Sequence, residues 1–387
     1  MTNILFLHAG AEMYGADKVM LDLVKRLDRS KYTPYVVLPM DGVLVDALKK
    51  EGINVTVMPY PIMRRKYFNP KGIIQYVTGM IKYTRKLAAF AKSHNIDLVH
   101  TNTAATLEGS FVSKKLHIPQ LWSIHEIIVS PKMMYVMTSR LISKYSSITI
   151  TDSAAVKRHL EKSGYFKKGS VKVIYNGVDS SRFSPDNDCS YLYDEWNIPR
   201  NARIIGMIGR VNSWKGQGDF LKAANMIMKK HPDVYTVFVG SAFEGEEWRE
   251  RELADAISRS PYRDRIINKG YRTDSEAIYR LYDVFVLPST NPDPLPTVVL
   301  EAMATGRPVV GYKHGGVCEM VKDGYNGLLA EVGSTEDLAD KIERLLEDKE
   351  LREKMGRNSR KRLLECFSIE SYVENYSNEY DRLTGKI

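Results

Sequence analysis

The sequence alternates between short apolar segments and amphipathic helical segments. The segment NILFLHAG (3–10) is apolar and ends at a glycine, and ADKVMLDLVKRL (16–27) after it carries apolar residues at helical spacing. Further apolar segments follow near 32–39, 53–60, 96–102, 118–126 and 146–153, with helical segments at 72–93, 106–115 and 133–145. Strands joined by helices form a parallel sheet that is covered on both faces. The first half is therefore predicted to be a doubly wound α/β domain.

A second series of the same kind begins near residue 202. Its apolar segments lie at 202–211, 234–240, 265–271, 283–289, 307–313 and 327–331, with helices expected at 275–282, 296–305 and 334–348. The turn-rich segment SVKVIYNGVDSSRFSPD separates the two series. We predict two Rossmann-like domains, residues 1–183 and 184–367, facing a cleft at the carboxyl ends of their strands, and a C-terminal helix, 368–387, that crosses back to the first domain.

Length and composition suit a two-domain cytoplasmic protein. The chain has 387 residues, 43% of them hydrophobic, yet no run of 18 apolar residues. Its start, MTNILFLHAGAEMYG, lacks the basic region and longer apolar core of a signal peptide. Its three cysteines are widely spaced, which predicts reduced thiols rather than disulfides or a zinc site.

The positive charge is concentrated in the first half. Residues 1–183 contain 27 Lys and Arg against 13 Asp and Glu, a net charge of +14, whereas the remainder has 29 against 34, or −5. Clustered cations attract polyanions such as nucleic acids and anionic membranes. The chain shows no signature of a nucleic-acid-binding module, so we expect no nucleic acid partner. An anionic membrane surface is the alternative to ordinary solvated lysines.

The segment PSTNPDPLPTVVLEAMATG (288–306) has the features of an anion site. Pro296 suits the first turn of a helix and Gly306 the position after its end. The free N–H groups of that helix start would follow a buried strand, where a phosphate binds well. Glu301 further along the helix can accept hydrogen bonds from a ribose diol, and Asp293 from another hydroxyl. In the loop GRVNSWKGQ, Arg210 and Lys215 can neutralise a diphosphate.

These motifs, with IYNGVD at the junction and SIHE after a strand, resemble the retaining GT-B glycosyltransferases of family 4, of the surface-polysaccharide type, over nearly the whole chain. The resemblance implies that Glu301 holds the nucleotide ribose, that Arg210 and Lys215 bind the diphosphate, and that Asp293 contacts the donor sugar. Asp293 is one methylene shorter than the usual Glu, which leaves the choice of sugar open. His125 would reach the transferred sugar.

The remaining site residues also follow from the resemblance. The predicted catalytic residues are His125, Arg210, Lys215 and Asp293. The predicted donor-binding residues are Gly15, Arg210, Lys215, Tyr271, Arg272, Asp293, Leu295, Pro296, Thr297 and Glu301, with Tyr271 and Arg272 near the base. The predicted acceptor-binding residues are Tyr14, Arg64 and Arg65. Gly315, Gly316 and Glu319 match an element that lines the donor side.

The resemblance implies transfer with retention of anomeric configuration, by front-face attack in which the leaving phosphate helps to deprotonate the acceptor. No metal and no other cofactor is expected beyond the nucleotide-sugar substrate. The acceptor is expected to be a glycan, carried on a polyprenyl diphosphate, in bacterial surface polysaccharide synthesis. The enzyme would then lie peripherally at the inner face of the plasma membrane.

The helix near 72–93 carries an apolar stripe that bears on this location. Ile73, Ile74, Val77, Ile81 and Leu87 form the stripe, among lysines and an arginine. Such a stripe is more typical of core packing, with membrane contact as the alternative. The segment PKMMYVMTSRLISK (131–144) mixes methionines and cations and can also contact lipid.

Other interpretations fit less well. GAEMYGAD has Ala16 and Asp17 where a P-loop requires Lys and Ser or Thr, which argues against a P-loop NTPase. No GxGxxG follows the first strand, which argues against a nicotinamide-dependent dehydrogenase. Asp186 and Asp188 spell the DxD of metal-dependent transferases, but they follow Ser-Pro at the junction, so we expect a loop. A nucleotide-sugar epimerase or hydrolase of the same fold, or a non-catalytic nucleotide-sugar-binding scaffold, remain the alternatives.

Overall fold

The computed structural model describes residues 1–64, 67–128 and 131–386. Two compact units make up the chain: Met1–Asn176 with Glu370–Ile387, and Gly177–Ile369. The sequence placed the junction after residue 183, whereas residues 177–183 belong to the second unit. The reason is local packing, because Val178 N–H donates to the Phe367 carbonyl (3.1 Å) and Phe183 lies edge-on to Tyr279.

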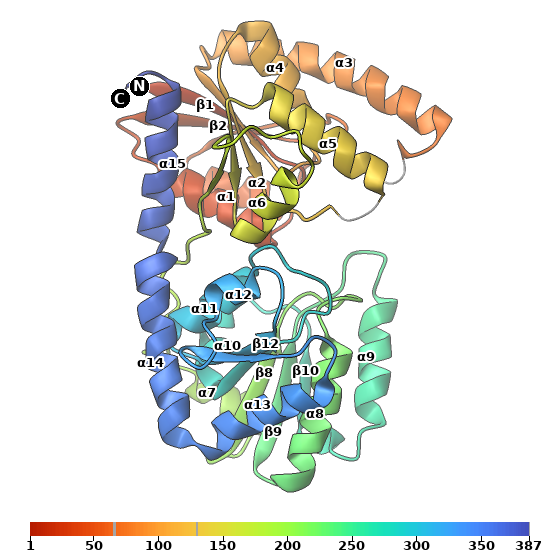
Figure 1. The fold of residues 1–387 in the computed structure, drawn as a ribbon, viewed down its shortest axis with the longest axis vertical. Coiled ribbons are helices and arrows are strands. Elements are labelled where there is room, and N and C mark those ends of the chain that lie inside the picture. The colour runs from red at the N-terminus through yellow and green to blue at the C-terminus, as the bar shows by residue number, and fades with distance from the viewer. Residues whose placement is uncertain (65–66, 129–130, 387) are drawn as a thin grey trace. The chain divides into compact units, whose positions relative to one another are not determined.

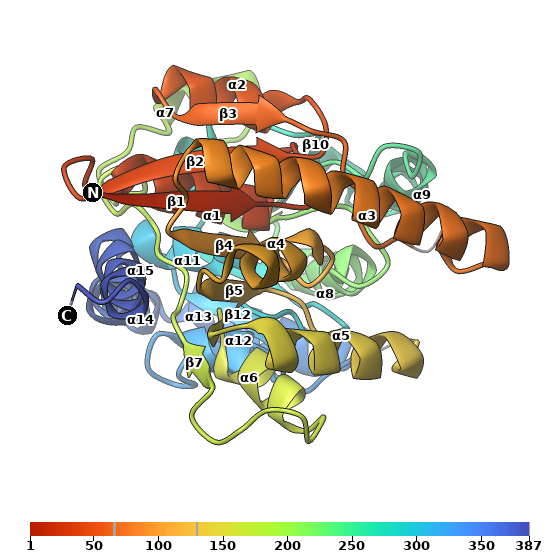
Figure 2. The same cartoon turned by 90° about the horizontal axis from the view of Figure 1, so that it is seen from above.

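The first unit contains a seven-stranded parallel sheet in the order β3-β2-β1-β4-β5-β6-β7. Figure 2 shows this order from β3 to β5. Its strands are β1 (Thr2–Leu7), β2 (Tyr32–Leu38), β3 (Asn54–Val57), β4 (Leu98–Asn102), β5 (Gln120–Ile124), β6 (Ile148–Thr151) and β7 (Val171–Val173). Strand β7 lies in the segment that the sequence analysis treated as the junction.

Helices cover both faces of this sheet (Figure 1). Leu5 and Val99 pack with Leu87 and Val112 of the helices on one face. On the other face, Phe6 packs against Tyr380 of the C-terminal helix. The helices of this unit are α1 (Gly15–Arg26), α2 (Val43–Lys50), α3 (Pro70–Ser93), α4 (Glu108–Leu116), α5 (Lys132–Tyr145), α6 (Ala154–Glu161) and α15 (Ile369–Leu383).

Polar contacts join α15 to the sheet of the first unit. The Tyr380 hydroxyl contacts His100 Nδ1 at 2.7 Å, and the Tyr376 hydroxyl contacts Ser123 Oγ at 2.8 Å. Both tyrosines are buried, and burial raises the pKa of each. Helix α15 is therefore an integral layer of the first unit.

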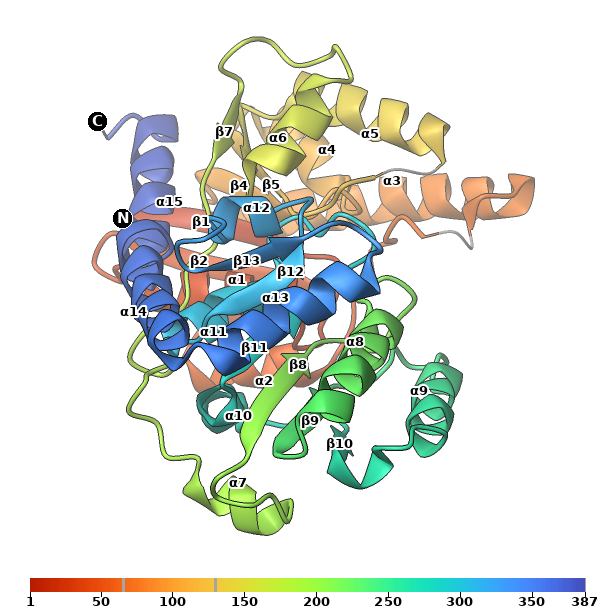
Figure 3. The ribbon, with the colours of Figure 1, turned by 60° about the horizontal axis from the view of Figure 1, so that its bottom comes forward.

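The second unit contains a six-stranded parallel sheet in the order β10-β9-β8-β11-β12-β13, visible in Figure 3. Its strands are β8 (Arg203–Ile208), β9 (Val234–Val239), β10 (Ile266–Lys269), β11 (Val284–Leu287), β12 (Val309–Tyr312) and β13 (Gly327–Ala330). Its helices are α7 (Ser190–Glu195), α8 (Gln217–Lys230), α9 (Trp248–Ser258), α10 (Ser275–Leu281), α11 (Thr297–Ala304), α12 (Val317–Met320), α13 (Thr335–Glu347) and α14 (Lys349–Cys366); a short 3-10 helix, η2, spans Arg263–Arg265.

Both sheets reverse their strand order beside the first strand, between β1 and β4 and between β8 and β11. Ligands of doubly wound sheets bind at such switch points, beyond the carboxyl ends of the strands. The prediction of two Rossmann-like domains is confirmed. The two switch points make the loops after β1, β4, β8 and β11 the places to look for a ligand site.

The apolar stripe of α3 was predicted to pack in the core, and this prediction is wrong for most of its residues. Leu87 is buried in the core, but Ile73, Ile74, Val77 and Ile81 are exposed. The reason is that α3 packs on the sheet and on α4 through its C-terminal half, where Leu87, Ala88 and Ala91 lie. In the part of the chain that the structure describes, no helix is long and apolar enough to span a bilayer.

Candidate functional site

An ion pair joins two loops at the carboxyl edge of the second sheet. Lys215, in the loop after β8, donates from Nζ to both oxygens of Asp293, at 2.9 and 3.0 Å. Asp293 follows β11, so the pair spans the switch point, and Ser289 donates a further hydrogen bond to it. The Asp293 side chain is only 8% exposed and that of Lys215 16%. Two of the predicted residues are thus brought into direct contact.

Backbone contacts hold these two loops together. Thr290 N–H donates to the Trp214 carbonyl at 2.7 Å. Gly216 has a φ of 83°, and a Cβ there would lie 1.9 Å from the Pro288 carbonyl oxygen. Glycine is therefore required by both conformation and space. Gly315 and Gly316, predicted to line the donor side, similarly pack against the backbone of 292–295.

Helix α11 begins next to this pair. Pro296 is its N-cap, Thr297 its first residue and Leu295 before it is buried. The free N–H groups of its first turn therefore begin at Thr297, four residues after Asp293, where an anion is favoured. Glu301 on α11 is 5% exposed, and the buried Tyr279 hydroxyl donates to its Oε2 at 2.7 Å. Burial and the Glu301 charge raise the pKa of Tyr279 far above its ordinary value.

Arg210 follows β8 at the same edge. Its guanidinium carbon lies 3.2 Å from the centre of the Phe243 ring, which is a close cation–π contact. Its carbonyl accepts from Gln217 Nε2 at 2.8 Å. Asn212 Oδ1 accepts from the N–H groups of Trp214 and Lys215, which shapes the loop between the two predicted cations.

The two residues predicted to lie near the base are held differently. The guanidinium of Arg272 pairs with Asp274 at 2.6 Å and with Glu195 at 2.7 Å. These hydrogen bonds raise the pKa of Arg272 and lower that of Asp274 to about 2. Tyr271 is 55% exposed, and its N–H donates to Ser241 Oγ. Arg272 therefore serves a carboxylate network in this structure, and its predicted contact with the donor stays a prediction.

In the first unit, His125 lies at the carboxyl end of β5. Its Nε2 contacts Asn102 Oδ1 at 2.8 Å, and its Nδ1 lies 3.4 Å from Asp152 Oδ2. Burial alone lowers the pKa of His125, but the hydrogen bond and charge of Asp152, with the charge of Glu126, outweigh it and the pKa is raised. Burial also raises the pKa of Glu126, whose Oε2 accepts from the N–H of Ala104.

The predicted N-terminal loop follows β1, which is separated from β5 by β4 in the sheet. Gly15 is the first residue of α1 and Tyr14 is its N-cap. The Tyr14 N–H donates to Asp17 Oδ2 at 3.0 Å, and Asp17 Oδ1 contacts His8 Nε2 at 2.8 Å. The start of α1 is therefore tied to the end of β1.

Arg64 lines a pocket of ≈ 240 Å³ in the first unit. Pro39, Met40, Pro59, Tyr60, Pro61, Ile62, Tyr67, Gln75, Gly79 and Tyr83 complete the lining. Tyr67 and Tyr83 offer flat faces and hydroxyls, whereas the buried Tyr60 hydroxyl already contacts the backbone of His8 and Val37. Arg64 adds an exposed cation, so the pocket suits a ligand with both rings and an anionic group. Arg65, the other basic residue predicted to bind the acceptor, lies outside the described residues.

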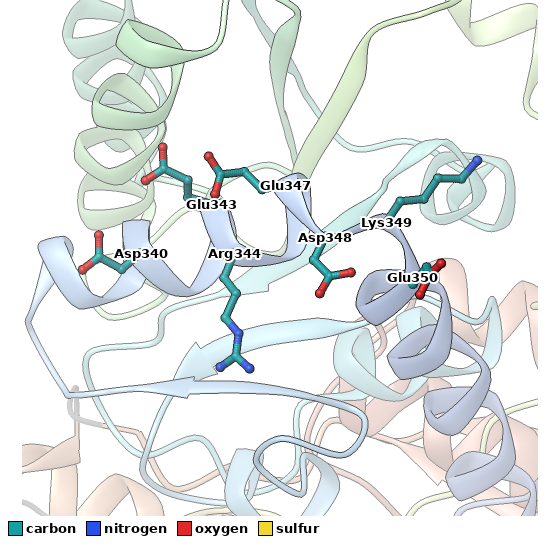
Figure 4. Close-up of a pocket in the computed structure, with 7 residues that line it drawn as sticks. All are labelled: Asp340, Glu343, Arg344, Glu347, Asp348, Lys349 and Glu350. Atoms are coloured by element: carbon teal, nitrogen blue, oxygen red, sulfur yellow. The ribbon is translucent and has the colours of Figure 1, made fainter.

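A larger hollow, of ≈ 500 Å³, lies along α13 and the start of α14 (Figure 4). Glu343 and Glu347 extend from one side of α13 and Arg344 from the other. The lining has five carboxylates and two cations: Asp340, Glu343, Arg344, Glu347, Asp348, Lys349 and Glu350. Such a surface repels a diphosphate. It is therefore a poor donor site.

His231, Glu343 and Glu347 could together hold a cation beside this hollow. Glu343 already pairs with Lys230 at 2.7 Å and with His231 Nε2 at 2.8 Å. The other ring nitrogen of His231 faces a guanidinium nitrogen of Arg203 at 3.3 Å, so His231 Nδ1 acts as an acceptor and its proton lies on Nε2. A metal at Nε2 would have to displace that proton, so the group is explained as an ion-pair cluster.

Two family models match the chain. The model described as Glycosyltransferase Family 4 matches residues 13–182, and that described as Glycosyl transferases group 1 matches residues 193–362. The chain belongs to the group 1, family 4 glycosyltransferases. This confirms the resemblance found in the sequence, and glycosyltransferase activity is the function that the family indicates.

Relatives and solved structures agree with this assignment. The glycosyltransferase is 25% identical to spore coat protein SA of Bacillus subtilis, with 95% of each chain covered. It is 27% identical to the UDP-Gal:alpha-D-GlcNAc-diphosphoundecaprenol alpha-1,3-galactosyltransferase of Escherichia coli, with 95% of this chain and 93% of the relative covered. The crystal structure of Anabaena HepE in complex with UDP and glucose has a TM-score of 0.86 and 26% identity, over 98% of this chain and 100% of that one. The GT-B fold class is confirmed.

Sequence reasoning missed the side chains that hold the predicted residues. Asp152, Asn102 and His8 surround His125 or connect to it, and Tyr279 holds Glu301. A signal existed for the first three, because each lies at the carboxyl end of a predicted parallel strand, in TDS, HTN and LHAG. Tyr279 lies inside an ordinary amphipathic helix, which gave no signal.

Proposed function

We propose that the chain transfers a sugar, with retention, from a nucleoside-diphosphate sugar to a hydroxyl group of a lipid-linked glycan. The observation that carries the proposal is the Lys215–Asp293 pair beside the start of α11. It puts a cation for a phosphate, a carboxylate for a sugar hydroxyl and a row of free N–H groups within one edge of the sheet. Glu301, fixed by Tyr279, supplies an acceptor for a ribose diol.

The chemistry follows from the charges at that edge. Breaking the bond between sugar and diphosphate leaves a dianion and an oxocarbenium-like carbon, so fixed positive groups lower the barrier. Arg210, Lys215 and the α11 N-terminus are those groups in the proposal. Because they neutralise the leaving group, no metal is needed, and the leaving phosphate can take the proton of the attacking hydroxyl. Asp186 and Asp188 serve turn hydrogen bonds instead, with Ser184 and the Ser190 N–H.

UDP-sugars are the donors to test first. The names of two similar proteins support this choice, since one is a UDP-Gal transferase and another was crystallised with UDP and glucose. We expect a nucleotide sugar to raise the melting temperature in the presence of a chelator. Glu301→Ala should abolish the rise, while Glu319→Ala, on α12 after the Gly315–Gly316 turn, should weaken it less. No stabilisation by UDP-, GDP-, dTDP- or CMP-sugars would contradict the proposed donor site.

The proposed acceptor site is the pocket that contains Arg64. A glycan ring fits against its tyrosines, and the Arg64 guanidinium suits the diphosphate of a polyprenyl carrier. The name of the E. coli relative, with its diphosphoundecaprenol acceptor, supports this class. Arg64→Ala should raise the KM for a lipid-diphosphate acceptor at least about tenfold and leave the donor KM unchanged. Release of free sugar at the same rate with and without acceptor would instead favour the hydrolase alternative.

The proposal includes peripheral binding to an anionic membrane. Helices α3 and α5 carry five and three basic residues and no acidic one. Their N-terminal halves extend on the same side of the first unit in Figures 1, 2 and 3, and carry exposed Ile73, Ile74, Val77, Met133 and Met137. Apolar side chains beside cations bind anionic lipid surfaces.

Sedimentation with lipid vesicles tests the membrane part by itself. The chain should bind vesicles of anionic phospholipid at low salt and should bind neutral ones much less. Ile74→Glu should reduce binding at least about tenfold, because it places a charge in the apolar surface. Leu364→Glu, which changes an exposed apolar residue of α14, is the matched control and should bind as the wild type does. Equal binding to anionic and neutral vesicles would contradict this part.

A further inference from the structure

Five side chains of the first unit form one continuous polar chain. Asp17 Oδ1 contacts His8 Nε2 at 2.8 Å, and His8 Nδ1 contacts Asn102 Nδ2 at 2.9 Å. Asn102 Oδ1 contacts His125 Nε2 at 2.8 Å, and His125 Nδ1 lies 3.4 Å from Asp152 Oδ2. The chain thus has a carboxylate at each end, two imidazoles and one amide between them.

The topology of the sheet brings these residues together. His8, Asn102, His125 and Asp152 lie at the carboxyl ends of β1, β4, β5 and β6, which are consecutive in the sheet, and Asp17 is on α1. Four of the five side chains are at least nine-tenths buried, and the fifth, that of Asp17, is 11% exposed. Water therefore has little access to the four links, so these polar groups have to satisfy one another.

Counting these protons fixes the charge of the chain. Three links are hydrogen bonds of 2.8 to 2.9 Å and need one donated hydrogen each, and the ion-pair contact of 3.4 Å takes a fourth, because His125 Nδ1 donates toward the Asp152 carboxylate. The carboxylates only accept, and the Asn102 side chain donates along one link and accepts along the other. The two imidazoles must supply the other three hydrogens, whereas two neutral imidazoles carry two. One histidine of the pair is therefore an imidazolium, whichever way the amide is turned.

The amide orientation shows which histidine carries the charge. Asn102 Nδ2 faces His8 Nδ1, so that nitrogen accepts and His8 is neutral, with its hydrogen on Nε2 toward Asp17. Asn102 Oδ1 faces His125 Nε2 and Asp152 faces His125 Nδ1, so both nitrogens of His125 donate. We propose that Asp17, His8 and Asn102 are positioning residues that, with Asp152, hold His125 as an imidazolium.

This charge state restricts what His125 can do. With hydrogens on both ring nitrogens and no free lone pair, it cannot remove a proton from an acceptor, and both N–H groups already point at Asn102 and Asp152, so it acts as a fixed positive charge. For catalysis this deepens the proposed function and rests on it. The same chain also fixes the start of α1, because Asp17 Oδ2 accepts the Tyr14 N–H at 3.0 Å.

The surroundings of His125 favour the charged form. Asp152 and Glu126 raise the pKa of His125, while burial opposes them. His100 on β4 also lies close, but burial lowers its pKa to about 3, so it is neutral and adds no repulsion. His8 and Asp17 complete the titratable groups of the chain itself.

Nitrogen-15 NMR of the full chain, labelled at histidine, tests the charge state without substrate. The protein has eight histidines, and His→Gln variants assign the two signals. At pH 7 the wild type should show two protonated ring nitrogens at His125 and one, Nε2, at His8. A neutral His125, or a charged His8 beside a neutral His125, would overturn the assignment.

Two near-isosteric variants shift the proton count in opposite directions. In Asn102→Asp the links contain no amide donor, so His8 should also become charged. In Asp152→Asn a second amide can donate, so His125 should become neutral. Glu343→Gln, which changes another carboxylate–imidazole pair at His231, is the matched control and should leave His8 and His125 unchanged. A His8 that stays neutral in Asn102→Asp would overturn the count.

Activity separates this inference from the proposed function. If His125 acts as a cation, Asp152→Asn should lower kcat at least about tenfold at pH 7 with a donor KM within about threefold. The pH profile of the wild-type transfer rate should not require the neutral, basic form of His125. The predicted NMR signals without transfer from any nucleotide sugar would uphold the inference and reject the proposed function. Transfer with a neutral His125 would do the reverse.

Discussion

The two sheets share one strand order over six strands, with β7 added in the first, but the two units hold their polar residues in different ways. At the carboxyl edge of the first sheet, five side chains satisfy one another in the linear series of contacts described above: Asp17, His8, Asn102, His125 and Asp152. This series is called the closed chain below, because its members use one another as partners. At the corresponding edge of the second sheet, Lys215 and Asp293 pair across two loops and the start of α11 lies beside them. One edge is internally complete, and the other keeps groups that a charged ligand can use.

This difference shows how one architecture can divide a task. A closed network is rigid, since moving any member leaves a buried polar group unsatisfied. An ion pair between loops can exchange one partner for a phosphate or a sugar hydroxyl at a smaller cost. The first edge is therefore suited to positioning and the second to binding, and variants of the two edges should behave differently.

Breaking the open pair should have the largest effect. Lys215→Met removes the proposed phosphate cation and should lower transfer at least about 100-fold. It also leaves Asp293 buried with Ser289 as its partner, so we expect a loss of about 3 kcal/mol in the free energy of unfolding. Activity assays and urea unfolding measure the two effects.

A double variant separates stability from activity in this pair. Lys215→Met with Asp293→Asn should recover most of the stability and none of the activity, because the buried charge is gone. Lys222→Met, which changes an exposed lysine on α8, should alter stability by less than about 0.5 kcal/mol. If the stability loss of the double variant equalled the sum of the losses of Lys215→Met and Asp293→Asn, the two residues would not be energetically coupled.

Outside the closed chain, Glu108 of the first unit is a buried carboxyl group with an oxygen that no described residue satisfies. Glu108 is fully buried, its Oε1 has no hydrogen-bond partner among the described residues, and burial raises its pKa to about 8. Its folded pKa exceeds the unfolded one, so its penalty is absent below the unfolded pKa and grows as pH rises toward 8. Glu108→Gln should therefore stabilise the protein by about 2 kcal/mol at pH 8 and hardly at pH 4.5.

Thermal unfolding between pH 4.5 and 8 measures this pH dependence. Glu161→Gln, at an exposed position on α6, is the control and should show no such trend. A stabilisation that is the same at both ends of the range would mean that Glu108 is ionised in the folded protein, and that the first unit tolerates an unpaired buried charge.

The closed chain should also lose stability as pH rises, but here the loss is that of a favourable interaction. The folded pKa of His125 is raised, so its contribution to stability is fully present below the unfolded pKa and is lost as pH rises through the folded one. Asp152→Asn should therefore destabilise the protein by about 1 to 2 kcal/mol at pH 6, and by less at pH 9. Urea unfolding at the two pH values measures the difference, and a constant loss would argue against a charged His125.

The two edges also differ in how far the sequence could predict them. Lys215, Asp293, Pro296 and Glu301 lie in two loops and a helix start, and their residue types and spacing indicated a site for an anion and hydroxyls. The closed chain depends on single residues from five separate elements. His125 was found through its motif, but its partners become visible only when the order of the strands is known, because β1 and β4 are neighbours despite their distance in sequence.

The sequence predicted the two sheets better than it predicted which helix residues are exposed. Alternation of strands and helices gave both sheets, yet it could not show that α3 packs through its C-terminal half and leaves Ile73, Ile74, Val77 and Ile81 exposed. Periodicity reports that one face of a helix is apolar, but not whether the neighbouring element is long enough to cover it. Residues 177–183 were misplaced for a similar reason, since their packing against the second unit depends on distant partners.

The smallest expected effect compares two tyrosines of the second unit. Tyr279 donates to Glu301 Oε2, whereas the buried hydroxyl of Tyr282 has no partner among the described residues. Tyr279→Phe should cost about 1 kcal/mol of stability and weaken donor binding about threefold to tenfold, because the Glu301 carboxylate loses its orientation. Tyr282→Phe removes an unsatisfied group and should leave binding unchanged and stability equal or slightly higher. Calorimetry with the donor and thermal unfolding measure both, and equal behaviour of the two variants would mean that groups other than the Tyr279 hydroxyl orient Glu301.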